Sequence, residues 1–204
     1  VFGSLSSNTA TEESKLNPSS PYAATKAAAE LLINSYCVTY DSDVIVTRCT
    51  NNYGPRQFPE KLIPKTIILA KQGQNIPIYG EGKNIRDWIH VDDHCNGILS
   101  LLLDGKSGQS YNISANNEMD NVTIVKMILE IMGKSEDLIE HVEDRPGHDF
   151  RYSMSSNKIS KEYSWKPKIS FKEGIEKTVE WYLNHEEIWK ELSPKILDST
   201  PWKN

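Results

Sequence analysis

Helix-like and strand-like patterns of hydrophobic residues alternate along this chain. Residues 4–20 are rich in Ser, Thr, Asn and Pro, which predicts a surface loop. The segment Tyr22–Tyr40 is rich in alanine and leucine and has no internal Pro or Gly, so we expect a long helix there. The short β-branched run Val44–Cys49 is typical of a buried parallel strand, and Asn51–Pro55 should end it in a loop.

The same alternation continues toward the C-terminus. We expect four more helices: at about 62–72, from a cap at Asp92 or Asp93 to about Leu103, from a cap at Asn121 to near Gly133, and from the capping box Ser170–Glu173 onward. Further strands are expected at Ile76–Tyr79, Arg86–His90 and Tyr111–Ile113. Strands that alternate with helices predict an α/β fold with a parallel sheet.

Composition and charge exclude several classes of protein. The 204 residues carry a formal charge of −5, which argues against a nucleic-acid-binding protein. No apolar run approaches the roughly 20 residues of a membrane span. Three scattered cysteines suit a reducing compartment better than a disulfide scaffold, so we expect a cytoplasmic protein. His90 and His94 lie four residues apart near acidic residues, but no further ligand stands at a standard zinc spacing, and we expect no metal.

The segment Tyr22–Lys26 carries the sharpest chemical signal. Positions four apart lie on one helix face, so the phenol of Tyr22 and the ammonium of Lys26 can share one site. A nearby cation favours the phenolate and lowers the tyrosine pKa, which would make Tyr22 a general base toward a hydroxyl. The alternative is a solvated pair with no function.

Cationic and amide side chains beside predicted turns and at strand ends suit a sugar diphosphate. Arginine binds phosphate oxygens bidentately, and Arg86, Arg145 and Lys61 all lie beside turn residues. Asn51 and Asn112 each lie at the C-terminal end of a predicted strand, where ligands bind in open α/β sheets. As alternatives, Arg86 can pair with Asp87 or Asp93, and Arg145 with Asp144 or Asp149.

Several motifs, in order, resemble one known family. The Tyr-x-x-x-Lys pattern is similar to that of the extended short-chain dehydrogenase/reductase superfamily. The further motifs resemble its dTDP-glucose 4,6-dehydratases; they include Ser20–Lys26, Asn51–Pro55, Phe58–Pro64, Pro77–Gly80, Ile85–Trp88, Tyr111–Ile113, Asp144–Asp149, Trp165–Pro167 and Thr178–Tyr182. The resemblance extends to about residue 185. It implies the C-terminal part of a Rossmann-type doubly wound parallel sheet and a smaller α/β nucleotide-sugar-binding domain.

The resemblance also implies a domain division and an activity. Residues 1–56 would belong to the NAD-binding Rossmann domain and 57–204 mainly to the nucleotide-sugar domain, with about 86–113 returning to the Rossmann sheet. The implied lyase reaction converts dTDP-glucose to its 4-keto-6-deoxy product with NAD as cofactor. Tyr22 and Lys26 would be catalytic and would also contact NAD, as would Asn52. The implied substrate-binding residues are Asn51, Lys61, Leu62, Pro77, Ile78, Tyr79, Arg86, Asn112, Asp144, Arg145 and His148.

Two departures and several alternatives accompany this resemblance. Phe2 and Ser114-Ala115 replace residues usual in the family, and the family's Asp-Glu elimination pair would precede Val1. We therefore expect an inactive C-terminal fragment that binds NAD weakly or not at all and exposes an apolar sheet edge. A UDP-glucose 4,6-dehydratase, a 4-epimerase, a UDP-glucuronate decarboxylase and a non-catalytic binding module are the other candidates. The Tyr22–Tyr40 helix resembles the family's homodimer helix, so we expect a homodimer.

Overall fold

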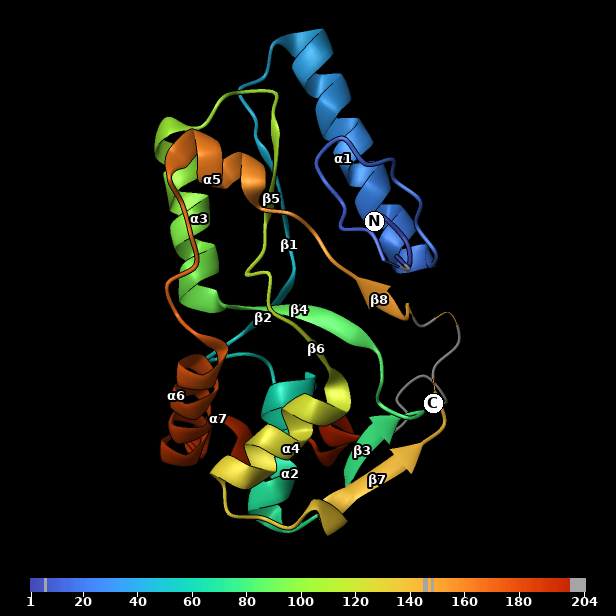
Figure 1. The fold of residues 1–204 in the computed structure, drawn as a ribbon, viewed down its shortest axis with the longest axis vertical. Coiled ribbons are helices and arrows are strands. Elements are labelled where there is room, and N and C mark those ends of the chain that lie inside the picture. Colours follow the sequence, from blue (N-terminus) through green and yellow to red (C-terminus); the bar gives the residue numbers. More distant parts are fainter. Residues whose placement is uncertain (6, 145–146, 148, 199–204) are drawn as a thin grey trace. The chain divides into compact units, whose positions relative to one another are not determined.

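Two compact units make up the chain, and each combines separate stretches of sequence. The computed structural model describes residues 1–5, 7–144, 147 and 149–198, with the side chain of Pro194 excepted (Figure 1). Unit 1 contains residues 1–52, 85–118 and 149–168, and unit 2 contains 53–84, 119–148 and 169 onward. The predicted division placed a boundary near residue 56 and a return over about 86–113. It did not include the third stretch of unit 1.

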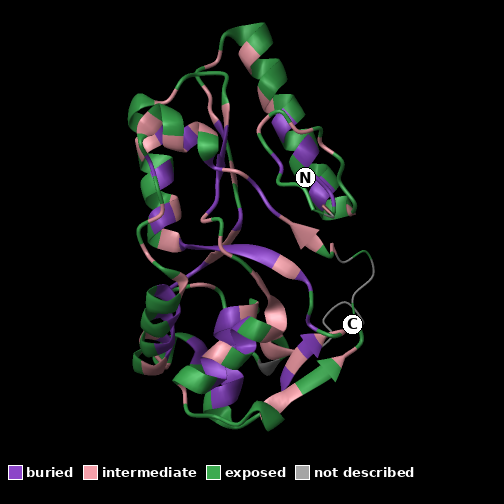
Figure 2. Ribbon diagram, in the orientation of Figure 1, coloured by how far each residue is buried: buried purple, intermediate pink, exposed green. Residues whose placement is uncertain are grey.

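A long helix, α1 (Pro21–Tyr40), dominates the N-terminal part of unit 1. Ser20 caps it, because the Ser20 hydroxyl accepts a hydrogen bond from the Ala23 amide at 3.2 Å. Pro21 follows as the first helical residue, where its missing N–H costs nothing. The predicted helix is confirmed, with its start one residue earlier. Figure 2 shows that most of α1 is exposed, and only a narrow face that includes Ala23 and Ala27 is buried.

Two parallel strands form the sheet in the middle of unit 1. Strand β1 (Val46–Cys49) pairs with β5 (Ser110–Ile113) so that Arg48 lies opposite Asn112. Helices α3 (Val91–Asp104) and α5 (Asn157–Tyr163) belong to the same unit. The core is built from large apolar side chains of these elements: Ile89, Leu101, Tyr111, Ile113, Ile159 and Trp165. The parallel pairing of strands joined through helices confirms the predicted α/β class.

Strand β4 (Ile85–His90) is the centre of a second sheet, which the sequence pattern only partly predicted. The strand order is β2–β4–β6, with β2 at Asn51–Tyr53 and β6 at Glu118–Asp120. Strand β8 (Arg151–Tyr152) also pairs with β4, in parallel. The predicted loop at Asn51–Tyr53 was therefore wrong. Strand β2 consists of two asparagines and a tyrosine, so it has no apolar pattern from which a strand could be predicted.

Unit 2 packs helices against a second parallel strand pair. Strand β3 (Ile76–Tyr79) pairs with β7 (Ile139–Val142). The helices are α2 (Leu62–Gln72), α4 (Asn121–Ile131), α6 (Phe171–Asn184) and α7 (Glu187–Lys190), with 3-10 turns η1 (Glu136–Leu138) and η2 (Pro194–Leu197). Most of α2 is buried (Figure 2). Its Leu69 and Ala70 share a core with Ile76, Ile78, Val125 and Leu129.

The helix ends agree with the predicted capping chemistry at two positions and correct it at two others. Ser170 caps α6, and Gly133 follows α4 with a φ of +61°, as expected for its position. The cap of α3 is His90, whose Nδ1 accepts from the Asp92 amide at 3.2 Å, and not Asp92 or Asp93. The cap of α4 is Asp120 and not Asn121. The observed cap lies two residues before Asp92 in α3 and one residue before Asn121 in α4. In both helices the side chain of this extended residue accepts a hydrogen bond from one of the first free N–H groups.

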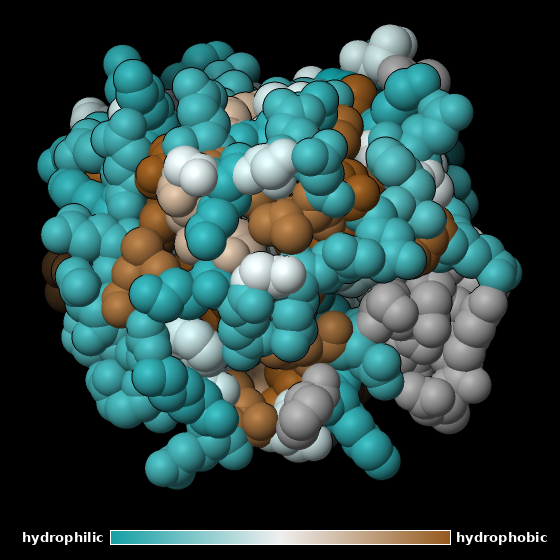
Figure 3. Space-filling view, turned by 90° about the horizontal axis from the view of Figure 1, so that it is seen from below, coloured by the Kyte–Doolittle hydropathy of each residue, from teal (hydrophilic) through white to brown (hydrophobic). Residues whose placement is uncertain are grey.

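The face of the molecule drawn in Figure 3 is mainly hydrophilic. Seen from below, hydrophobic residues show only in patches between polar side chains (Figure 3). Among the helices of the described residues, none has the length and apolar character needed to cross a membrane.

Candidate functional site

Tyr22 and Lys26 occupy the first two turns of α1. The ammonium nitrogen of Lys26 lies 5.7 Å from the centre of the Tyr22 ring, so the two side chains are neighbours as the spacing predicted. Both are open to solvent within this chain, and Tyr22 is 72% exposed. The arrangement offers an accessible phenol next to a cation, which is what proton abstraction from a bound hydroxyl requires.

An ion pair fixes α1 to strand β1. The Arg48 guanidinium donates to both carboxylate oxygens of Glu30, with Nη2 to Oε2 at 2.7 Å and Nε to Oε1 at 2.9 Å. Both side chains are 11% exposed. Glu30 lies one turn beyond Lys26 on the same side of the helix, so this pair holds the helix that carries Tyr22 and Lys26.

Asn112 is buried at the end of strand β5 with an unused amide. It is fully buried, and neither its side-chain nitrogen nor its side-chain oxygen has a hydrogen-bond partner in the described part of the chain. Its backbone N–H donates to the Glu12 carboxylate at 2.8 Å. An unpaired buried amide is costly, so its presence at a strand end is consistent with the predicted ligand-binding role. Glu12 lies in a loop rich in Ser, Thr and Asn, where no sequence pattern marked it.

Asn51 and Asn52 lie at the start of β2, close to the end of β1. The Asn51 side-chain oxygen accepts a hydrogen bond from the Tyr152 hydroxyl. The Asn52 side-chain nitrogen donates to the Thr50 carbonyl at 3.2 Å. Tyr152 was not among the predicted site residues, although it stands only three residues after the predicted motif Asp144–Asp149.

Arg86 is almost completely buried, at 4% exposed, and binds backbone oxygens. Its guanidinium donates to the carbonyls of Asp149 at 2.6 Å, Ile85 at 2.7 Å and Phe150 at 3.1 Å. It also lies over the Tyr152 ring, 4.4 Å from the ring centre. The structure therefore gives Arg86 a part in holding residues 149–152 that neither sequence alternative foresaw.

Residues 149–154, here called the return segment, are joined to the N-terminal loop. The Asp149 carboxylate accepts from the Ser19 hydroxyl at 2.7 Å, next to the cap of α1. The Leu5 amide donates to the Arg151 carbonyl at 2.8 Å, and the Ala10 amide donates to the Ser153 carbonyl at 3.0 Å. The return segment thus links β4, Asn51 and the start of α1 within unit 1.

Asp87, next to Arg86 in β4, is a buried carboxylate. It is 1% exposed, and its Oδ1 accepts from the Asn117 amide at 2.7 Å. Burial raises the pKa of Asp87 above its ordinary value, while the backbone hydrogen bond opposes that rise. Through this hydrogen bond to Asn117, the Asp87 carboxylate holds the turn that follows β5.

In the described residues, no group of three or more His, Cys, Asp or Glu side chains is arranged to hold a metal ion.

The predicted site residues of unit 2 lie around α2 and β3. Lys61 precedes α2 and is exposed, with its ammonium 2.5 Å from the Glu60 carboxylate. Leu62 opens α2, Ile78 is buried in the core, and Asp144 is exposed near Gly80. Pro77 and Tyr79 are half-buried on β3. Arg145 and His148 lie outside the described residues.

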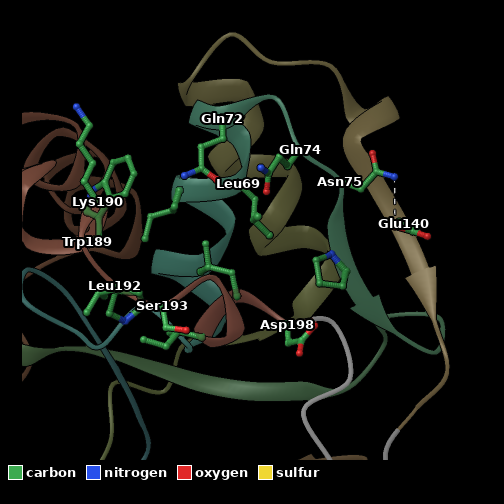
Figure 4. A pocket seen from close by; sticks show the side chains of 15 residues that line it. Leu69, Gln72, Gln74, Asn75, Glu140, Trp189, Lys190, Leu192, Ser193 and Asp198 are labelled. Atoms are coloured by element: carbon green, nitrogen blue, oxygen red, sulfur yellow. Dashed lines mark hydrogen bonds between the residues drawn. The ribbon is translucent and has the colours of Figure 1, made fainter. Parts of the chain in front are cut away.

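A pocket of about 440 Å³ lies in unit 2 between α2, β3, β7 and the segment from α7 to Asp198 (Figure 4). Its lining combines apolar side chains such as Leu69 and Trp189 with polar ones, including Asn75, which donates to Glu140 at 3.2 Å. Among the predicted substrate residues with described positions, Pro77 alone lines it. This pocket is therefore not the predicted sugar-diphosphate site.

Known proteins resemble this chain over most of its length. A dTDP-glucose 4,6-dehydratase of Streptomyces niveus is 46% identical over 202 residues, which are 98% of this chain and 60% of that protein. The crystal structure of a dTDP-glucose 4,6-dehydratase from Bacillus anthracis, in complex with NAD, superposes with a TM-score of 0.91 at 47% identity, covering 95% of this chain and 62% of that one. The chain thus spans about 60% of the length of these relatives.

A more distant enzyme has the same fold. A UDP-glucuronic acid 4-epimerase from Bacillus cereus, in complex with UDP-glucuronic acid and NAD, superposes with a TM-score of 0.86 at 26% identity, covering 90% of this chain and 59% of that one. The predicted Rossmann-type fold class and the resemblance to the dTDP-glucose 4,6-dehydratases are confirmed. The family model described as GDP-mannose 4,6 dehydratase matches residues 1–178, and the chain belongs to that family.

Proposed function

We propose that the protein containing this chain is an NAD-dependent dTDP-glucose 4,6-dehydratase. The observation that carries the proposal is the pair of Tyr22 and Lys26 side by side on α1, in a chain for which several relatives at 42–47% identity bear that name. The buried, unpartnered amide of Asn112 in the same unit supports a ligand at the strand ends.

The residues of this chain suit the first step of that reaction. Tyr22 takes the proton of the hexose 4-hydroxyl, and the Lys26 ammonium stabilises the phenolate that does so. Lys26 is exposed and has three N–H donors, so it also fits the hydroxyls of a nicotinamide ribose, and Asn52 would face the same cofactor. NAD, when bound, accepts a hydride from the sugar and later returns it. Asn51, Asn112 and Arg86 would hold the sugar diphosphate.

A 4-epimerase is the second candidate, because a solved epimerase shares the fold at 26% identity. It would remove the same hydroxyl proton but would not eliminate water. A homodimer through α1 is also proposed, since Leu31, Leu32 and Tyr40 on that helix are each at least 60% exposed. A cytoplasmic location stays a prediction from the cysteine pattern.

The test uses the complete protein with NAD and dTDP-glucose, and product analysis by mass spectrometry. We expect a product lighter by one water. Tyr22→Phe should lower kcat at least about 100-fold, the usual size of a lost general base, with little change in nucleotide-sugar affinity. Tyr36→Phe on the same helix is the control, because Tyr36 is also exposed, at 51%.

Two results would contradict the proposal. A Tyr22→Phe enzyme as active as the Tyr36→Phe control would remove Tyr22 from the chemistry. A product of unchanged mass with an inverted C4 centre would identify the epimerase instead.

A further inference from the structure

Tyr152 contacts two of the predicted substrate-binding side chains at once. Its hydroxyl donates to the Asn51 side-chain oxygen, and its ring lies 4.4 Å from the Arg86 guanidinium carbon. We propose that Tyr152 is a positioning residue, which fixes the Asn51 amide and the Arg86 guanidinium in the orientation that binds the sugar diphosphate. This inference rests on the proposed function and adds a residue that orients two side chains of the proposed substrate site.

The hydroxyl of Tyr152 determines which end of the Asn51 amide is free. A side-chain amide has an acceptor oxygen and a donor nitrogen, and a half-turn exchanges them. Because the oxygen is occupied by Tyr152, the nitrogen faces the other way. The Asn51 side-chain nitrogen makes no hydrogen bond in the described part of the chain. Phosphate and sugar oxygens are acceptors, so a free donor is the end that such a ligand needs.

The ring of Tyr152 determines how the Arg86 guanidinium lies. In the β4–β8 pairing Arg86 stands opposite Tyr152, so the backbone itself brings the two side chains together. The aromatic face attracts the cation, while the carbonyls of Asp149 and Ile85 bind its N–H groups. The guanidinium is therefore held both on its face and along its edge.

This dual contact separates positioning from ordinary packing. If Tyr152 only filled space, removal of its hydroxyl would change stability and leave ligand affinity unchanged. If it orients Asn51, the same change frees the amide to turn, and the acceptor oxygen can face the ligand. Affinity then falls even though no group that touches the ligand has been removed.

The experiment measures binding and turnover in the complete protein. Calorimetry gives Kd for dTDP-glucose and UDP-glucose, and kinetics give kcat and KM, for the wild type, Tyr152→Phe, Asn51→Ala and the double variant. Tyr163→Phe is the matched control, because it removes a unit 1 hydroxyl that lies 3.1 Å from the Tyr111 hydroxyl. Thermal unfolding of every variant reports stability separately.

We expect Tyr152→Phe to raise Kd and KM about five- to tenfold, with kcat within about twofold of wild type, the signature of lost binding. Asn51→Ala should raise Kd similarly, and the double variant should bind no more weakly than Asn51→Ala. Tyr163→Phe should leave Kd unchanged.

Three results would overturn the inference. The first is a Tyr152→Phe variant with the Kd of the wild type. The second is a fold increase in Kd of the double variant equal to the product of the increases in the single variants, and the third is a wild type that binds neither nucleotide sugar. A wild type that binds a nucleotide sugar but yields no dehydrated product would refute the proposed function alone. The positioning role of Tyr152 would then be tested by the difference in Kd between the wild type and Tyr152→Phe.

Discussion

The ion pair between Glu30 and Arg48 gives the largest predicted effect on stability. Arg48→Met removes the cation that donates three hydrogen bonds to the Glu30 carboxylate, and Glu30 is only 8% exposed. Stranding one charge of a buried pair typically costs about 3–5 kcal/mol. A domain is stable by only about 5–15 kcal/mol, so the loss is a large fraction of the total.

The size of this effect can be measured by thermal unfolding. For a chain of this length, each kcal/mol lowers Tm by about 2–4 °C, so Arg48→Met should lower Tm by roughly 6–20 °C. Removing both charges, with Glu30→Leu and Arg48→Met together, should restore most of that loss, because apolar replacements of a buried pair are often neutral or stabilising. Circular dichroism of the three proteins at one pH and salt concentration gives the comparison.

Two outcomes decide whether this reasoning holds. If Arg48→Met unfolds within about 2 °C of wild type, the pair is not buried in solution. If the double variant is as unstable as the single one, the loss comes from packing and not from an uncompensated charge. Arg48→Lys adds a further check, since it keeps the charge but cannot form the bidentate contact and should fall between wild type and Arg48→Met.

Two further changes test other parts of the fold. Gly82→Ala should destabilise unit 2 by about 2–4 kcal/mol in denaturant unfolding, because Gly82 has a φ of +71° and an added Cβ would lie 2.6 Å from the Ile78 side chain. Gly133→Ala, at a φ of +61° with no heavy atom within 4 Å of the added Cβ, should cost only about 1 kcal/mol, and equal losses would exclude the steric cause. Burial raises the pKa of Asp87, so the folded state holds its proton to higher pH than the unfolded state, and stability contributed by this group falls as pH rises from about 3.8 through the raised pKa. Asp87→Asn should flatten that part of the stability–pH curve, and an unchanged curve would mean that another group titrates there.

Local features of the fold could be predicted from the sequence, and long-range ones could not. The α1 helix and the position of Tyr22 next to Lys26 follow from spacing within one helix, and β3 follows from four consecutive residues. Strand β2 was missed because its residues show no apolar pattern. The cap of α4 was placed one residue late and the cap of α3 two or three residues late, since several nearby side chains could serve.

In the candidate site, too, local features could be predicted from the sequence and long-range contacts could not. Its predicted members came from local motifs, whereas the contacts that hold them join distant residues. Glu12 binds the backbone of Asn112 from 100 positions away, and Tyr152 binds Asn51 from 101 positions away. No periodicity links such pairs, and only the folded chain brings them together. The same is true of Arg86, whose carbonyl partners at 149 and 150 could not be known from its own motif.

The interleaving of the two units has a consequence for biosynthesis. Unit 1 needs residues up to 168, so a growing chain on the ribosome cannot complete it until residue 168 has emerged. The first 52 residues must wait for partners that are synthesised much later, and contacts that close over such long separations form slowly. Neither unit can be isolated by one cut, so genetic dissection of this protein calls for substitutions or rejoined segments instead of simple truncation.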